Sequence, residues 1–106
     1  LNVQFNYEEP EVVNGAWITG MVIDKSYNID KHLFMKKMKD EGVPSRPFFY
    51  PLSSIPAFNL SEKYKVKNPN SYDISSRGVN LPGAPNLSSE QLKYICNKVR
   101  KVLTND

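Results

Sequence analysis

The sequence has one histidine and one cysteine among 106 residues, and this scarcity excludes several kinds of site. A single cysteine cannot form a disulfide within the chain, so Cys96 is expected to be a small, buried apolar residue on a helix. His32 has no metal-ligand spacing around it, which favours a surface histidine and no metal site. The sequence also lacks Cys-x-x-Cys, His-Glu-x-x-His, Gly-x-Ser-x-Gly and glycine loops that hold phosphates. It therefore predicts no complete catalytic centre, and we assign no catalytic residue.

Long apolar runs and a strong excess of one charge are absent too. No apolar stretch approaches the roughly 18 residues of a membrane-spanning helix, so no membrane partner is predicted. The net charge is only +3, and the lysines do not interleave with the aromatics. This pattern favours solvated faces over a nucleic-acid site in which Phe48 and Tyr50 stack on bases. The lone cysteine is typical of a reducing compartment, and we expect a cytoplasmic protein.

What the sequence does contain predicts one folded α+β domain over residues 1–106, because 40% of the residues are hydrophobic. Helices are expected to cover one face of a small antiparallel or mixed sheet. Residues 3–5, 16–23 and 79–82 have the pattern of extended segments. The segment 16–23 is apolar on both faces, so it is expected to lie centrally in the sheet with Trp17 buried.

Capping signals predict the helices. Asp30 is suited to begin one that runs to about residue 40 and ends at Gly42. Its lysines are expected on the solvent-exposed face, and Leu33, Phe34 and Met38 are expected on the buried face. Ser88 and Gln91 form a capping box before the last helix. The apolar stripe of that helix is Leu92, Ile95, Cys96, Val99, Val102 and Leu103.

The region between these helices is less regular. Asn68 and Pro69 open a short helix that is expected to run to about residue 76, where Gly78 ends it. Arg77 is expected to act at the C-terminus of that helix. Residues 53–67 have no clear period and are predicted to be a loop with a short helical turn.

The stretch Gly42–Leu52 combines three prolines with an arginine and three consecutive aromatics. Each proline fixes φ near −65° and favours extended backbone before it, so a stiff ribbon is predicted. Two interpretations stay open. Arg46, Phe48 and Tyr50 line a pocket, or Phe48 and Tyr50 are buried on one face of an edge strand.

Three motifs, in this order, resemble the C-terminal domain of the DegT/DnrJ/EryC1/StrS family. Members of this family are pyridoxal-phosphate-dependent aminotransferases that act on nucleotide-linked keto-sugars. The motifs are Trp17–Asp24, then Arg46–Leu52 with Ile55–Phe58, then Ser75–Pro82 with Leu87–Gln91 and the last helix. The resemblance covers residues 12–104 and looks most like the perosamine-synthetase branch.

The resemblance implies the C-terminal small domain of a fold-type I aminotransferase, which forms a homodimer and carries a large cofactor domain elsewhere in its chain. The absence of an initiator methionine agrees with a piece of a longer protein. The family's Schiff-base lysine and its other pyridoxal phosphate contacts match no residue here. The piece alone is therefore expected to bind no cofactor and to be inactive.

The resemblance also implies that this domain closes one side of the sugar-nucleotide site, with Arg46, Phe48, Tyr50 and Ser53 near the substrate. For Arg46 an ion pair with Asp24 or Glu41 is the structural alternative. A free-standing, non-catalytic binding module that uses the aromatic ribbon is the alternative for the chain as a whole.

Overall fold

The computed structural model describes residues 1–58 and 63–104. Within these residues the chain forms a four-stranded sheet with the order β1-β2-β4-β3, and every neighbouring pair is antiparallel. The strands are β1 (Val3–Phe5), β2 (Thr19–Ile23), β3 (Arg46–Pro47) and β4 (Gly78–Leu81). The predicted α+β class is confirmed, and β2 is an inner strand as expected.

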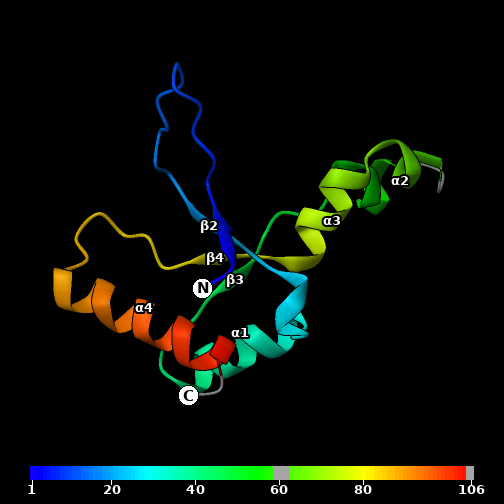
Figure 1. Ribbon diagram of the computed structural model, residues 1–106. Helices are drawn as coiled ribbons and strands as arrows, with labels where there is room; N and C mark the ends of the chain where they lie inside the picture. The colour runs from blue at the N-terminus through cyan, green and yellow to red at the C-terminus, as the bar shows by residue number, and fades with distance from the viewer. Residues whose placement is uncertain (59–62, 105–106) are drawn as a thin grey trace.

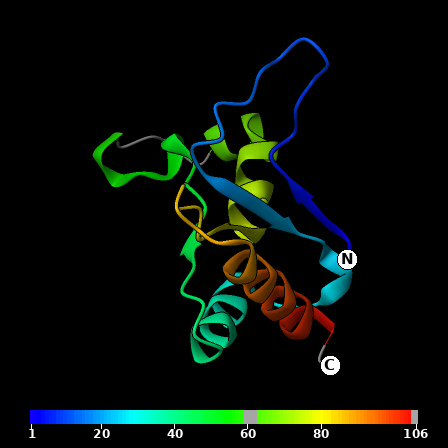
Figure 2. The ribbon, with the colours of Figure 1, turned by 90° about the vertical axis from the view of Figure 1, so that its left-hand side faces the viewer.

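Helices lie on two sides of this sheet (Figure 1). α1 (Lys31–Asp40) and α4 (Ser89–Thr104) pack side by side below it, and Figure 2 shows the same pairing from a second direction. α3 (Pro69–Arg77) lies behind β2 in Figure 2, next to the short α2 (Lys63–Lys67). Single 3₁₀ turns connect these elements at η1 (Lys25–Tyr27), η2 (Leu52–Ser54) and η3 (Pro56–Phe58).

The hydrophobic core fills the space between the sheet and the pair α1 and α4. Its members are Met21, Ile23, Phe34, Met38, Val43, Val79, Ile95, Val99, Val102 and Leu103. Side chains of a strand point alternately to opposite faces, so Met21 and its partner Val79 face the core. The other face of the inner strands, which we call the distal face, is formed by Gly20, Val22, Gly78 and Asn80.

Local sequence signals explain why the two core helices begin and end where they do. The carboxylate of Asp30 accepts hydrogen bonds from the backbone N–H groups of His32 and Leu33 at the start of α1. Gly42 follows its end with φ 77°, a conformation that favours glycine. Before α4, Ser88 and Gln91 exchange side-chain-to-backbone hydrogen bonds of 2.8 and 3.2 Å. Both predicted capping signals are confirmed.

The prediction for Trp17 is wrong: β2 begins only at Thr19, and the Trp17 side chain is 79% exposed. The side chain of Asn6 bonds both the Ile18 carbonyl and the Gly20 N–H, so it occupies backbone groups on either side of Thr19, where β2 begins. Ala16 has φ 49°, a left-handed conformation that turns the chain just before Trp17. The tryptophan therefore projects beside the sheet instead of lying within it.

The buried faces of α1 and α4 are narrower than the apolar stripes that periodicity predicts. Leu33, Leu92 and Cys96 are exposed, because only the centre of each apolar stripe faces the sheet and the other helix. Lys31 is buried, contrary to the expectation that all lysines of this helix face solvent. Its aliphatic stem is covered while its ammonium group donates a hydrogen bond to the Ser75 carbonyl of α3.

The irregular region contains more helix than expected. Two 3₁₀ turns and α2 occupy the described parts of the segment predicted as a loop, and residues 59–62 of that segment lie outside the described residues. α3 ends at Arg77, close to its predicted end. Across the ranges that the structure describes, no helix has both the length and the apolar character needed to cross a bilayer.

Candidate functional site

Two glycines on the distal face make room for the ring of Phe48. A Cβ atom on Gly78 would lie 2.7 Å from Phe48 Cβ, and one on Gly20 would lie 3.1 Å from Phe48 Cε2. The Phe48 N–H also donates to the Gly78 carbonyl at 3.0 Å. The ring is thus held against the sheet by backbone that leaves no space for a side chain.

Phe48 begins a row of three aromatic rings. Phe49 meets Phe48 edge to face, with the ring centroids 5.7 Å apart. On its other side Phe49 stacks on Trp17 at 6.2 Å with an interplanar angle of 23°. These distances fall within the range in which aromatic pairs attract one another. The row therefore joins the ribbon after β3 to the loop before β2.

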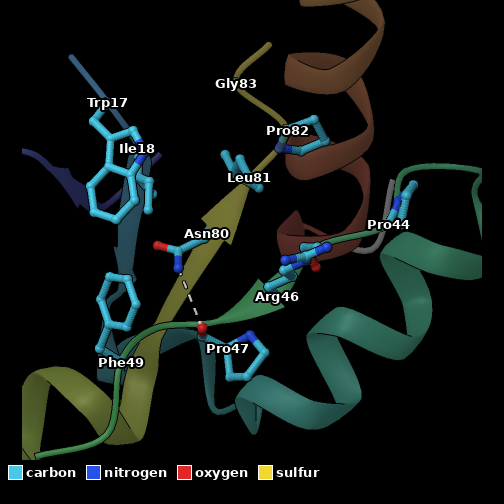
Figure 3. A pocket seen from close by; sticks show the side chains of 11 residues that line it. Trp17, Ile18, Pro44, Arg46, Pro47, Phe49, Asn80, Leu81, Pro82 and Gly83 are labelled. Carbon is cyan, nitrogen blue, oxygen red and sulfur yellow. Dashed lines mark hydrogen bonds between the residues drawn. The ribbon is translucent and has the colours of Figure 1, made fainter.

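A cleft of about 500 Å³ lies beside this row (Figure 3). Trp17 and Phe49 form one wall, and Arg46 of β3 lies across the cleft from them. Asn80 of β4 lies between the two sides, because it pairs with Arg46 on one side and with Gly20 on the other. The space over Gly20 is filled by the ring of Phe48 and the side chain of Asn6, so the cleft lies on the Arg46 side of this row.

Arg46 is exposed, and among the described residues it forms no ion pair and no side-chain hydrogen bond. Both carboxylates that the structural alternative required are engaged elsewhere. Asp24 accepts from the Ser26 N–H at 2.9 Å, and Glu41 pairs with Lys98 at 2.6 Å and Lys101 at 2.7 Å. The guanidinium group is therefore available to an anionic ligand at the cleft.

The other three predicted substrate residues do not join Arg46 in this cleft. Phe48 is the end of the aromatic row that lies against Gly20 and Gly78, and Tyr50 is 57% exposed with its ring centroid 5.2 Å from the ammonium nitrogen of Lys31. The Ser53 hydroxyl is hydrogen-bonded to the Tyr72 hydroxyl of α3 at 3.0 Å. A second, apolar hollow continues from the row, and it is lined by Pro47, Phe48, Phe49, Tyr50, Leu52 and Ile55.

Trp17, Phe49 and Asn80 line the cleft although the sequence did not predict them to be near the substrate. Asn80 did carry a signal, because it is a polar residue inside the apolar strand Gly78–Leu81. Trp17 was misread as a core residue because it lies in an otherwise apolar run. The interpretation that buries Phe48 and Tyr50 on one face of an edge strand is wrong, because β3 ends at Pro47 and Tyr50 is exposed, and Phe49 lines the cleft instead.

An ion-pair cluster fixes α3 against β2 at one end of the distal face. Arg77 donates to the Ile23 carbonyl and pairs with Asp73, which also meets Lys25 at 2.9 Å. The hydrogen bond from Arg77, followed by that from Lys25, lowers the pKa of Asp73 to about 2. Arg77 thus acts in the last turn of α3, as predicted, and it binds the preceding turn and the neighbouring strand.

The cleft does not fit a pyridoxal phosphate site, which needs a lysine and a partner for the pyridine nitrogen, because no lysine and no carboxylate is among the residues that line it. Lys31 is buried, with its ammonium group held by the Ser75 carbonyl, while Lys25 and Lys36 form ion pairs at the surface. Within the described part of the chain, no group of three histidine, cysteine, aspartate or glutamate residues could hold a metal ion.

Comparison with known proteins agrees with the motifs. The model of the DegT/DnrJ/EryC1/StrS aminotransferase family matches residues 2–100. The chain is 34% identical over 101 residues to a GDP-perosamine synthase of Vibrio cholerae, an overlap that covers 94% of this chain and 27% of that protein. It is 32% identical over 99 residues to a GDP-perosamine synthase of Escherichia coli O157:H7, covering 93% of this chain and 26% of that protein.

A more distant relative is the putative pyridoxal phosphate-dependent aminotransferase EpsN of Bacillus subtilis (strain 168). The identity is 24% over 91 residues, which cover 84% of this chain and 23% of that protein. The chain thus spans about a quarter of the length of the curated relatives it matches. Because the family model extends over nearly all of its residues, the chain belongs to the DegT/DnrJ/EryC1/StrS aminotransferase family.

Proposed function

We propose that this chain is the C-terminal small domain of a pyridoxal-phosphate-dependent aminotransferase that aminates a nucleotide-linked keto-sugar, as perosamine synthases do. In this proposal the domain closes one side of the sugar-nucleotide site with the cleft beside the aromatic row. Two relatives named GDP-perosamine synthase support the reaction class. The compartment proposed is the cytoplasm, where an exposed free thiol such as that of Cys96 persists.

The observation that carries the proposal is the state of Arg46. It is a guanidinium without a carboxylate partner among the described residues, and it lies across a cleft from stacked aromatic rings. Guanidinium groups bind phosphate oxygens bidentately, and rings stack on the base or sugar of a nucleotide. A nucleoside diphosphate linked to a sugar presents both kinds of group on one molecule.

The cofactor belongs, in this proposal, to a large domain elsewhere in the same longer polypeptide, because the cleft does not fit it. Pyridoxal phosphate supplies the electron sink for amino-group transfer when it is bound there. The exposed apolar side chains of the ribbon and of the turns that follow it, among them Phe49, Leu52 and Phe58, suit a surface that this large domain covers. The longer protein is proposed to be a homodimer.

Replacing Arg46 by alanine in the longer enzyme tests this function. We expect kcat/KM for the nucleotide-linked keto-sugar to fall by about one to two decades, because a charge-assisted hydrogen bond is worth roughly 1.5–3 kcal/mol. Cofactor absorbance should not change. Arg100→Ala on α4 is the matched control, since that exposed arginine lies outside the cleft and should leave kcat/KM as it is.

Two results would contradict the proposal. An Arg46→Ala enzyme with normal kcat/KM and a lower melting temperature would make this arginine structural. A longer polypeptide without an aminotransferase cofactor domain would instead favour the free-standing binding module.

A further inference from the structure

Two buried polar atoms of residues at the cleft have no hydrogen-bond partner among the described residues. Among the residues described, the buried side-chain oxygens that lack a hydrogen bond are Asn80 Oδ1 and Ser45 Oγ, and both residues line the cleft. Ser45 lies before β3, and its hydroxyl can donate as well as accept a hydrogen bond, whereas the amide oxygen of Asn80 only accepts. Asn80 lies on the distal face, so its oxygen is a buried, unpaired acceptor beneath the surface of the cleft.

The orientation of the Asn80 amide is fixed from its other end. Asn80 Nδ2 donates to the Pro47 carbonyl at 3.4 Å, so Oδ1 points the opposite way, towards the side of Trp17 (Figure 3). A buried acceptor without a hydrogen bond destabilises the folded protein, and a ligand that donates a hydrogen bond to it removes this penalty. Such atoms in a native structure often mark a binding role. The missing group is a hydrogen-bond donor that approaches from the Trp17 side.

The position of Trp17 indicates what kind of group carries that donor. Trp17 is 79% exposed, and Phe49 stacks near-parallel to it, so a further planar ring can extend the stack. The residue follows Ala16, which has φ 49°, in a connection outside the sheet. The exposed side chain of Trp17 is accordingly the part of the cleft that can move aside when a planar ring approaches Asn80 Oδ1.

We infer that Asn80 is a specificity-determining residue that accepts a hydrogen bond from an N–H group of a nucleobase stacked on Trp17. Arg46, across the cleft, binds the diphosphate of the same molecule. This inference rests on the proposed function and adds an orientation to it, with the base at Trp17 and Asn80 and the phosphates at Arg46. It also requires a donor on the edge of the base.

The chain contains a single tryptophan, so Trp17 fluorescence reports on this cleft alone. The experiment titrates the 106-residue chain with guanosine, pyrophosphate and GDP, and compares Asn80→Leu, Asn80→Asp and Arg46→Gln. NMR of the single indole N–H follows pyrophosphate, which does not quench by stacking. Asn97→Leu, at an exposed position on α4, is the matched control and should behave as the unmodified chain.

We expect each of the two variants, Asn80→Leu and Arg46→Gln, to weaken the binding of a different ligand. Asn80→Leu should weaken guanosine about tenfold and leave pyrophosphate unchanged, whereas Arg46→Gln should weaken pyrophosphate about ten- to a hundredfold and leave guanosine unchanged. Asn80→Asp should keep guanosine affinity, because its carboxylate still accepts a hydrogen bond. Both Asn80 variants lose the bond to the Pro47 carbonyl, so a purely structural role would weaken guanosine equally in both.

A second measurement needs no variant. Purine riboside lacks the amino group and the N1–H of guanosine, so the unmodified chain should bind it about tenfold more weakly. Equal affinity for the two nucleosides, or an Asn80→Leu variant that binds guanosine normally, would overturn the inference. If pyrophosphate binds through Arg46 while guanosine does not bind, the inference fails and the proposed function stands. If neither pyrophosphate nor GDP binds, both fail.

Discussion

At the scale of single residues, the site depends as much on missing side chains as on present ones. Phe48 lies flat on the distal face because Gly20 and Gly78 present only backbone beneath its ring. Phe48 in turn supports Phe49, which supports Trp17. The wall of the cleft is therefore built on two glycines that contact no ligand themselves.

Gly78→Ala should destabilise the chain by about 1–3 kcal/mol, the usual cost of forcing extra volume into a packed site. The new methyl group would lie 2.7 Å from both the Ile74 carbonyl oxygen and Phe48 Cβ, and the carbonyl belongs to helical backbone that cannot move freely. Urea unfolding measures the loss. Gly15→Ala is the control, since nothing lies within 4 Å of its Cβ position, and equal stability of the two variants would contradict the packing.

Other residues show which features of burial a sequence pattern does not predict. Periodicity found the centre of the α4 stripe, with Ile95 and Val99 buried, but it could not show that the stripe is covered only in part, which leaves Leu92 and Cys96 exposed. It ranked Lys31 as a surface residue because the carbonyl that binds its ammonium group lies 44 positions away in the chain. Contacts between distant segments set such outcomes, and a local pattern does not contain them.

At the scale of elements, the predictions that held are those with a local cause. Asp30 and the pair Ser88 and Gln91 satisfy helix N–H groups within three residues of themselves, so their neighbours alone determine the helix starts. The cleft is the opposite case. It joins Trp17, Arg46 and Asn80 from three strands or their connections, and only the sheet register brings them together. The three motifs of the resemblance contain all of these residues, but only Arg46 among them was expected near the substrate.

The junction of α1 and α4 has a pH dependence that follows from Glu41. Hydrogen bonds from Lys101 and then Lys98 lower the pKa of Glu41 to about 2 from its usual 4.5. A carboxylate with a lowered folded-state pKa stabilises the fold above its unfolded pKa, and this contribution disappears as pH falls through the folded value. Stability should therefore decline between about pH 4.5 and 2.

Glu41→Gln should remove part of this acid-induced loss, because the variant has no carboxylate to protonate at the junction. Melting temperatures across the acid range, measured for both proteins, test this. Asp40→Asn is the control, since Asp40 pairs only with the exposed Lys36 one helical turn earlier. An unchanged acid slope in Glu41→Gln would show that the Lys98 and Lys101 contacts contribute nothing in solution.

At the scale of the whole molecule, the two faces of the sheet are treated differently. One face, with α1 and α4, encloses a core of ten buried hydrophobic residues, which gives the chain a reason to fold by itself. The distal side carries the aromatic row, the cleft and exposed apolar side chains. The buried core therefore lies on one side of the sheet, and the cleft proposed for the substrate lies on the other.

This division predicts how the isolated chain responds to pyridoxal phosphate. After mixing and borohydride reduction we expect no stoichiometric label on any one lysine. Lys31 is buried with its ammonium group bound to the Ser75 carbonyl, Lys98 and Lys101 are paired with Glu41, and Lys25 is paired with Asp73.

Mass spectrometry of the reduced chain makes the measurement, with free lysine at the same cofactor concentration as the reference for unspecific reaction. One lysine labelled to completion would mean that the chain holds the cofactor after all, and a label on Lys31 would further mean that its contact with α3 opens readily. Low, scattered labelling would leave the cofactor to the rest of the longer polypeptide, and this division of labour is what a domain that contributes one wall of a substrate site requires.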